Sequence, residues 1–245
     1  MSKQKRLRIF AGPNGSGKST IITIVKNVGI DMGIYVNADE IKKEFERNSF
    51  LNFELYTIFV RDNEFKDEFI KSSFFDIERQ NNIASFVKVE DNKLYCANED
   101  MYDLISTYTA DLIRTRLLEN CTKFTFETVM SHPSKIEFIQ KAHDSGYKTY
   151  LYFVSLEDPE LNKERVKARV KLNGHGVPED KIESRYYRTM DLLFDALKIV
   201  DKAFFFDNSG SKSVYFAKYE EGEIVILSQE EVPQWFHTYV IDKLN

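Results

Sequence analysis

The sequence predicts an α/β protein with a mainly parallel sheet, helices on both faces of that sheet, an inserted aromatic-rich segment, and a C-terminal hairpin plus helix. Three observations support this fold class. Short apolar runs alternate with helical patterns, a glycine-rich turn joins the first strand to the first helix, and a turn separates two β-rich runs near the C-terminus. Alternating strands and helices are typical of parallel sheets, because each connection between parallel strands crosses over one face.

The elements follow one another in the order that this fold requires. Residues 7–11 predict a short buried strand, residues 12–17 a glycine-rich turn, and residues 19–28 a helix with one apolar face. A second strand is predicted at 33–37, and a helix starts at Asp39. The elements expected after residue 102 are a helix at 103–119, strands at 123–126 and 148–156, helices at 133–145, 158–172 and 178–200 with Pro178 as a first helical residue, a strand at 203–207, a hairpin at 213–218 and 223–228, and a helix at 233–244.

The segment from about 48 to 102 gives a weaker pattern. Its many aromatic residues are atypical of a solvated linker, and VEDNK supplies turn chemistry for a short hairpin near 85–97. We interpret the chain as one domain over residues 1–245, with a folded insertion at about 48–102 and a lid at about 158–188.

Composition narrows the classes of function. The 245 residues carry a formal net charge of -5, which argues against nucleic acid as a partner, since such binding usually needs a basic face. No apolar run approaches the roughly 20 residues of a membrane span, and the N-terminus lacks the pattern of a signal peptide. Cys96 and Cys121 belong to no Cys/His cluster, so we expect two buried apolar side chains in a cytoplasmic protein that does not contact the membrane.

The glycine-rich turn carries the clearest chemical signal. Residues 12–19 read GPNGSGKS, the complete G-x-x-x-x-G-K-[ST] phosphate-binding loop, or P-loop, and they stand between a strand and a helix as that loop requires. Lys18 can reach the β- and γ-phosphates of ATP, and the Ser19 hydroxyl can ligate Mg²⁺. The residues expected to bind the nucleotide here are Gly12, Pro13, Asn14, Gly15, Ser16, Gly17, Lys18, Ser19 and Thr20.

Two carboxylates follow predicted strands, at the sheet edge where parallel folds bind ligands. Asp39 follows GIYVN and Glu127 follows KFTF. A carboxylate in either place can accept the proton of an attacking hydroxyl, orient that hydroxyl, or hold water on the metal. The structural alternatives are a helix N-cap for Asp39 and a surface acid for Glu127.

The predicted helix at 158–172 is strongly basic. Arg165 and Arg169 are spaced i, i+4 and share a face, as expected of a lid that neutralises a transferring phosphoryl group. Asn173-Gly174-His175-Gly176 follows as a hinge, and Arg185 lies in the next helix. A solvated basic face and, for Arg185, a surface ion pair remain the alternatives.

Together these segments resemble the zeta-toxin-like P-loop kinases. The resemblance rests on GPNGSGKST at 12–20, VNADEI at 36–41, FTFETVMS at 124–131, ERVKARVKLNGHGVPEDKIESRYYR at 164–188 and FFDNSG at 205–210. It implies a P-loop kinase fold, Mg²⁺ and ATP as cofactors, and an antitoxin protein as a partner. UDP-N-acetylglucosamine is the acceptor of the family's toxins.

The resemblance also assigns roles to individual residues. Asp39 would be the base on the acceptor hydroxyl, Glu127 would hold the acceptor or a metal-bound water, and Thr128 would touch the acceptor. Arg169 would be a lid arginine. The family's second lid arginine falls nearest His175, so either His175 or Arg185 takes its role. Asp207 and Asn208 would lie near the adenine.

The sequence favours a kinase of a small hydroxyl-bearing molecule. A polynucleotide or nucleoside kinase and a nucleotide-binding switch module without phosphotransfer are the alternatives. The basic lid favours a kinase over a switch, and the acidic insertion argues against an RNA substrate. The long segment after the second strand and Val129 after Phe-Glu-Thr depart from the family pattern and leave the acceptor open.

Overall fold

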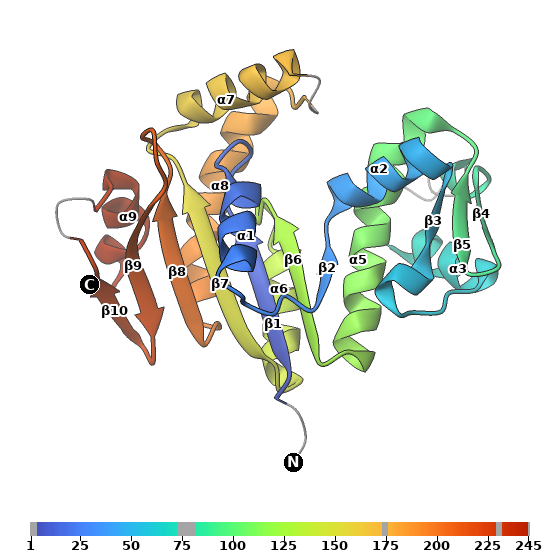
Figure 1. Cartoon of the computed structure of the whole chain (residues 1–245), viewed down its shortest axis with the longest axis horizontal. Helices are drawn as coiled ribbons and strands as arrows, with labels where there is room; N and C mark the ends of the chain where they lie inside the picture. The colour runs from blue at the N-terminus through green and yellow to red at the C-terminus, as the bar shows by residue number, and fades with distance from the viewer. Residues whose placement is uncertain (1–3, 73–81, 173–175, 229–231, 245) are drawn as a thin grey trace. The chain divides into compact units, whose positions relative to one another are not determined.

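The computed structural model describes residues 4–72, 82–172, 176–228 and 232–244 (Figure 1). The chain divides into two compact units. The first combines Met1–Gly33 with Thr122–Asn245, and the second is Ile34–Cys121. The second unit contains the segment at about 48–102 that the sequence suggested as an insertion.

The first unit is built on a mainly parallel sheet with the strand order β10-β9-β8-β7-β1-β6. Strand β1 pairs in parallel with β6 and β7, and β7 pairs in parallel with β8, whereas β9 pairs antiparallel with both β8 and β10. The strand bounds are β1 Arg6–Ala11, β6 Lys123–Thr128, β7 Lys148–Ser155, β8 Lys202–Asp207, β9 Val214–Glu220 and β10 Glu223–Ile226. The predicted parallel sheet and C-terminal hairpin are therefore confirmed.

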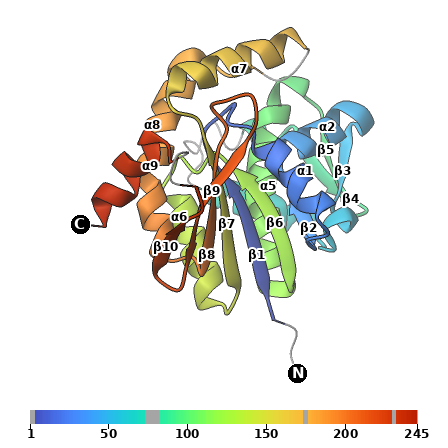
Figure 2. The same cartoon turned by 60° about the vertical axis from the view of Figure 1, so that its left-hand side comes forward.

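Helices cover both faces of this sheet. Helix α1 packs on β1 and β7, whereas α6 packs on β7 from the opposite side and contacts α8, which contacts α9 (Figures 1 and 2). The helix bounds are α1 Lys18–Asn27, α6 Ser134–Asp144, α7 Pro159–Lys171, α8 Glu179–Leu197 and α9 Gln234–Tyr239, followed by the 3-10 turn η4 at Ile241–Lys243. Among the described residues, none of the helices combines the length and apolar character that a membrane crossing needs.

Strand β1, which lies between β7 and β6, is strongly apolar. Leu7, Ile9 and Phe10 are fully buried, as expected for a strand covered on both faces. On one face, Phe10 stacks on Tyr152 of β7 with ring centroids 4.5 Å apart, and Tyr152 stacks on Phe204 of β8 at 4.8 Å. This row of rings fixes the strand that leads into the phosphate loop.

The second unit has its own small sheet and core. Strands β3, β5 and β4 form an antiparallel sheet in that order, and helix α2 packs along α5. Phe65 and Phe69 each meet Tyr108 of α5 edge to face. The bounds are β2 Ile34–Val36, α2 Ala38–Asn48, β3 Phe50–Asn52, η1 Phe53–Tyr56, α3 Asp62–Lys71, β4 Val87–Glu90, β5 Lys93–Cys96, η2 Glu99–Met101 and α5 Tyr102–Asn120.

Several expectations about element ends are wrong. Strand β6 includes Glu127, because its pairing with β1 continues as far as Thr128 opposite Ala11. Pro178 lies one residue before α8 as its N-cap. The expected final helix ends at Tyr239, because Val240 leaves helical geometry with φ -128° and ψ -62°.

The cysteines and the segment before residue 72 also differ from expectation. Cys96 is buried as expected, but Cys121 is only partly buried. Strand β3 and helix α3 lie in the segment that gave no clear pattern. Strand β3 is three residues long, too short for alternation to show, and pairs with β5 about 43 residues later in the chain.

Candidate active site

The phosphate loop connects β1 to α1 through three glycines with positive φ: 147° at Gly12, 75° at Gly15 and 94° at Gly17. Gly12 has a steric reason as well, because a Cβ there would lie 1.9 Å from the carbonyl oxygen of Val154 in the neighbouring strand β7. Glycine therefore lets the loop turn away from the sheet while β1 and β7 stay paired.

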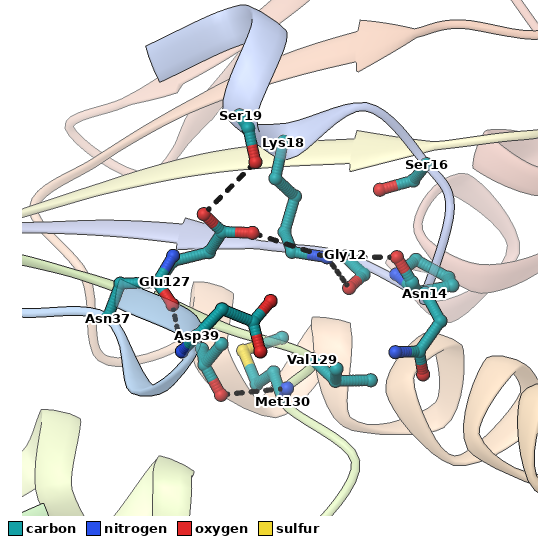
Figure 3. A network of polar contacts seen from close by, with 12 residues as sticks. Gly12, Asn14, Ser16, Lys18, Ser19, Asn37, Asp39, Glu127, Val129 and Met130 are labelled. Atoms are coloured by element: carbon teal, nitrogen blue, oxygen red, sulfur yellow. Dashed lines mark hydrogen bonds and ion pairs between the residues drawn. The ribbon is translucent and has the colours of Figure 1, made fainter. Parts of the chain in front are cut away.

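Lys18 and Ser19 start helix α1 and face Glu127 at the end of β6 (Figure 3). The Lys18 ammonium donates to the carbonyls of Gly12 and Pro13, both at 3.0 Å, and lies 3.9 Å from Glu127 Oε1. The Ser19 hydroxyl donates to Glu127 Oε2 at 3.4 Å. The structure thus brings together the predicted lysine, the predicted metal-binding hydroxyl and one predicted carboxylate.

The chemistry of this group suits a nucleotide phosphate and Mg²⁺. The N-terminus of α1 presents N–H groups and the positive end of its dipole, and its first turn holds no acidic residue. Lys18 is buried, which strengthens its attraction for phosphate. Hydroxyl and carboxylate oxygens, as in Ser19 and Glu127, are ligands or second-sphere partners that Mg²⁺ prefers.

The turn after β6 is hydrogen-bonded to α8. Thr128 Oγ1 accepts from the Met130 N–H at 3.0 Å, and Met130 takes a positive φ of 57°. The Thr189 hydroxyl of α8 donates to the Val129 carbonyl at 2.7 Å. Thr128, expected to touch the acceptor, therefore belongs to a fixed turn beside Glu127.

Arg165 and Asn208 meet at the turn after β8. The guanidinium of Arg165 donates to the Asn208 carbonyl, and also to the Gly210 carbonyl at 3.4 Å. The Asn208 side-chain amide donates to the carbonyl of Ser16 at 2.8 Å, so this turn is tied to the phosphate loop. Arg165, predicted to be a catalytic lid residue, holds the turn in place.

Asp207, expected near the adenine, anchors the C-terminal helix. Its Oδ2 accepts from Trp235 Nε1 at 2.9 Å and from the Ser209 hydroxyl at 3.0 Å. Nearby, burial and the charge of Asp207 raise the pKa of Glu157. Two carboxylates at the ends of β7 and β8 thus face the first turn of α9.

The remaining lid residues lie on α7 and α8. Arg169 is exposed on α7, one turn beyond Arg165, and Arg185 is half-buried on α8, where burial and the charge of Arg188 lower its pKa. Ion pairs connect the two helices: Lys163 with Glu183 at 2.6 Å, and Lys167 with Glu179 at 3.0 Å. His175 lies outside the described residues.

Asp39 lies in the second unit, at the exposed start of α2. The N-cap of that helix is Asn37, whose Oδ1 accepts from the Asp39 N–H at 2.7 Å (Figure 3). The alternative interpretation of Asp39 as the N-cap is therefore wrong. Its carboxylate has no capping role and stays a candidate base.

Sequence reasoning missed Asn162 and Trp235. The side chain of Asn162 is fully buried and donates to the Asn14 carbonyl of the phosphate loop at 2.6 Å. The only sequence signal was its i, i+4 spacing from buried Val166, which places an amide on the apolar face of α7. Trp235 gave no signal, because its carboxylate partner is 28 residues away in the chain.

Comparison with known proteins identifies the family. The zeta toxin family model matches residues 91–220, more than half of the chain. This chain belongs to the zeta toxin family. The matched stretch includes Glu127, Thr128, the arginines of α7 and α8, and Asn208, whereas the phosphate loop and Asp39 precede it.

Individual relatives are more distant. An uncharacterized protein of Haemophilus influenzae is 35% identical over 63 residues, which cover 26% of this chain and 45% of that protein. A chain in the crystal structure of AvrRxo1-ORF1:AvrRxo1-ORF2 with sulphate ions has a TM-score of 0.56 and 16% identity, over 93% of this chain and 62% of that one. A chain in the crystal structure of the same pair with ATP also has a TM-score of 0.56 and 16% identity, over 94% of this chain and 62% of that one.

These similarities concern the fold and only part of each relative. At 16% identity the two structures show the fold alone, which is the P-loop kinase fold expected from the sequence. The chain spans less than two thirds of the length of each of these relatives.

Proposed function

We propose that this chain is an ATP-dependent kinase of zeta-toxin type, which transfers the γ-phosphate of Mg·ATP to a hydroxyl of a small molecule in the cytoplasm. UDP-N-acetylglucosamine or another nucleotide sugar is the proposed acceptor class. The observation that carries the proposal is the group formed by Lys18, Ser19 and Glu127 at the start of α1. Membership of the zeta toxin family supports it, and so does the structure of a relative with ATP.

The residues of the first unit would bind and orient the nucleotide. Lys18 would exchange its bonds to the loop carbonyls for the β- and γ-phosphates, since its flexible stem ends in three donors. Ser19 and Glu127 would hold Mg²⁺, directly or through water. Bound Mg²⁺ would neutralise phosphate charge and orient the terminal phosphoryl group.

The acceptor side rests on carboxylates and lid arginines. We assign Asp39 as the base that takes the proton of the acceptor hydroxyl, and Glu127 and Thr128 as acceptor contacts. Arg169, together with His175 or Arg185, would place positive charge on the transferring phosphoryl group from the lid at 158–188. Arg165 would act by fixing the turn at Asn208 and Gly210.

The decisive experiment is ³¹P NMR of the full chain with Mg·ATP and a panel of acceptors: UDP-N-acetylglucosamine, other nucleotide sugars, nucleosides and a 5′-hydroxyl oligonucleotide. A new phosphomonoester signal with a sugar nucleotide is the expected result. A signal with a nucleoside or the oligonucleotide would favour the alternative kinases, and ATP binding without any transfer would favour a switch module.

Two substitutions assign the roles. Lys18→Ala should remove ATP use, because it deletes the ammonium that would bind the β- and γ-phosphates. Asp39→Asn keeps the shape of the side chain and should keep ATP binding while transfer is lost. Full transfer by Asp39→Asn would overturn the base assignment and leave the kinase proposal intact.

A protein partner is part of the proposal. AvrRxo1-ORF1 is crystallised with AvrRxo1-ORF2, and by analogy we propose an antitoxin that binds this chain. Expression of the chain with Lys18→Ala beside wild type in a growth assay tests the need for such a partner. Equal growth of the two strains would argue against toxicity.

A further inference from the structure

The side chain of Asn162 is an amide buried where a helix should bury an apolar residue. It lies in the first half of α7, is 0% exposed, and donates its Nδ2 to the Asn14 carbonyl at 2.6 Å. Burying an amide carries a desolvation cost, and here its Oδ1 has no hydrogen-bond partner among the described residues. An apolar residue would avoid this cost, so the contact with the loop needs a reason.

The loop is shaped to receive α7. A Cβ on Gly15 would lie 2.9 Å from the Asn162 carbonyl oxygen and 3.2 Å from Val166 Cγ2. The backbone of Gly15 therefore packs directly against one turn of α7, and the Asn162 side chain of that turn forms a hydrogen bond with the loop.

A second asparagine forms a hydrogen bond with the loop, at the carbonyl two residues after that of Asn14. Asn208 donates its Nδ2 to the Ser16 carbonyl at 2.8 Å, and its amide lies so close to Gly17 that a Cβ there would be 2.1 Å away. The two amides thus hold the carbonyls of alternate peptides, Asn14–Gly15 and Ser16–Gly17, from two different elements.

The geometry of the peptide bond gives this arrangement a function. In a trans peptide the C=O and the following N–H point in opposite directions. Turning the Asn14 carbonyl toward Asn162 therefore points the Gly15 N–H away from α7. Turning the Ser16 carbonyl toward Asn208 points the Gly17 N–H away from the turn after β8. A phosphate-binding loop binds its ligand through backbone N–H groups that face the phosphates, so the direction of each peptide matters.

We propose that Asn162 is a positioning residue for phosphoryl recognition: it orients the Asn14–Gly15 peptide so that the Gly15 N–H binds the β,γ-phosphate end of the triphosphate. Asn208 does the same for Gly17. The inference rests on the proposed nucleotide binding and adds to it the residues that set the direction of the N–H groups. It also means that α7 takes part in phosphate binding near its N-terminus, through Asn162, as well as through its arginines.

The test is the affinity of the full chain for a non-hydrolysable Mg·ATP analogue and for AMP, by calorimetry. Asn162→Ala should weaken binding of the triphosphate roughly five- to tenfold, which is the effect of one oriented hydrogen bond. It should change the affinity for AMP less than twofold. Asn162→Asp keeps the shape of the side chain but offers only acceptors to the Asn14 carbonyl, so it should lower the affinity for the triphosphate further. Thr149→Val is the control, since it removes a buried hydrogen bond to Asp201 at the opposite end of the sheet.

The control separates positioning from stability. Asn162→Ala and Thr149→Val should both lower the melting temperature without nucleotide, but only Asn162→Ala should weaken the triphosphate. The inference would be overturned if Asn162→Ala weakened the binding of ATP and AMP equally, or if it weakened neither while wild type binds ATP. Failure of wild type to bind ATP would instead overturn the proposed function.

A measurement on the wild-type protein tests the inference even if the variants do not fold. In ¹H–¹⁵N spectra, Mg·ATP should shift the amides of Gly15 and Gly17 strongly. The amides of Gly29 and Gly146, whose turns face open space, should stay in place. An unmoved Gly15 amide on ATP binding would refute the assignment.

Discussion

Replacing Gly17 by alanine is the sharpest test of how the phosphate loop is held. Gly17 has φ 94°, and an added Cβ would lie 2.1 Å from Asn208 Nδ2. The positive φ costs about 1–2 kcal/mol for an L-residue. Asn208 would also have to move away from the Ser16 carbonyl, which costs about 0.5–1.5 kcal/mol for the lost hydrogen bond. The reduced freedom of the unfolded chain offsets about 0.4–1 kcal/mol of this sum, so we expect Gly17→Ala to lower the unfolding free energy by about 2 kcal/mol.

Gly29→Ala is the matched control. Gly29 has a φ of 82°, close to that of Gly17, but nothing lies within 4 Å of its Cβ position. Only the backbone cost applies there, and the reduced freedom of the unfolded chain offsets about 0.4–1 kcal/mol of it. Gly29→Ala should therefore cost about 1 kcal/mol, clearly less than Gly17→Ala.

Urea unfolding followed by Trp235 fluorescence measures both values, since Trp235 is the single tryptophan and lies in the first unit. In an Asn208→Ala background the steric conflict is gone, so Gly17→Ala should then cost no more than Gly29→Ala. This predicts a coupling of about 1 kcal/mol between positions 17 and 208. Equal costs for the two single glycine variants, or strictly additive effects of Gly17→Ala and Asn208→Ala, would refute the reasoning.

Three further predictions follow from the site and the elements that support it. Trp235→Phe keeps an aromatic side chain but removes the indole N–H, which donates to Asp207 at 2.9 Å. The unfolding free energy, measured by circular dichroism, should therefore fall by about 1.5–3 kcal/mol, and no change would show that this hydrogen bond does not hold α9. Burial, then the charge of Asp207, raises the pKa of Glu157 above 4.5, so the folded state binds that proton more tightly than the unfolded state. Wild-type stability should therefore fall as the pH rises from below 4.5 through the folded-state pKa, and Glu157→Gln should flatten that part of the pH profile; parallel profiles would contradict this. Arg169→Ala should lower kcat more than ATP affinity, and an unchanged kcat would support the solvated basic face.

Much of the fold was predictable because its signals are local. The strand, glycine turn and helix at the start of the chain need only neighbouring residues to be recognised, and the same is true of the hairpin near residues 85–97. Prediction from the sequence was weaker where pairing with a strand distant in the chain determines where an element ends or whether it forms. Strand β6 runs on to include Glu127 because β1 lies beside it, and β3 forms through its pairing with β5.

The candidate site shows the same division. Lys18, Ser19 and Glu127 were predicted from motif and strand end, and the structure brings them within 4 Å of one another as a group. Asn162 was missed because its meaning depends on the Asn14 carbonyl, 148 residues away. Arg165 was predicted as a lid arginine from its spacing, but spacing cannot show that two carbonyls of the turn at 208–210 accept its guanidinium.

The sequence by itself determined the chemistry that this protein can offer: a phosphate loop, a serine for a metal, carboxylates at two strand ends and a basic helix. These follow from residue types at fixed short spacings, which backbone geometry alone converts into a local shape. Only the tertiary structure decided which of these groups meet at the start of α1 and which side chains hold the phosphate loop in place. That choice depends on which distant donor reaches each carbonyl. Asn162 and Asn208 reach carbonyls of the phosphate loop, and Arg165 reaches the Asn208 carbonyl, only because α7 and the end of β8 fold against the start of α1.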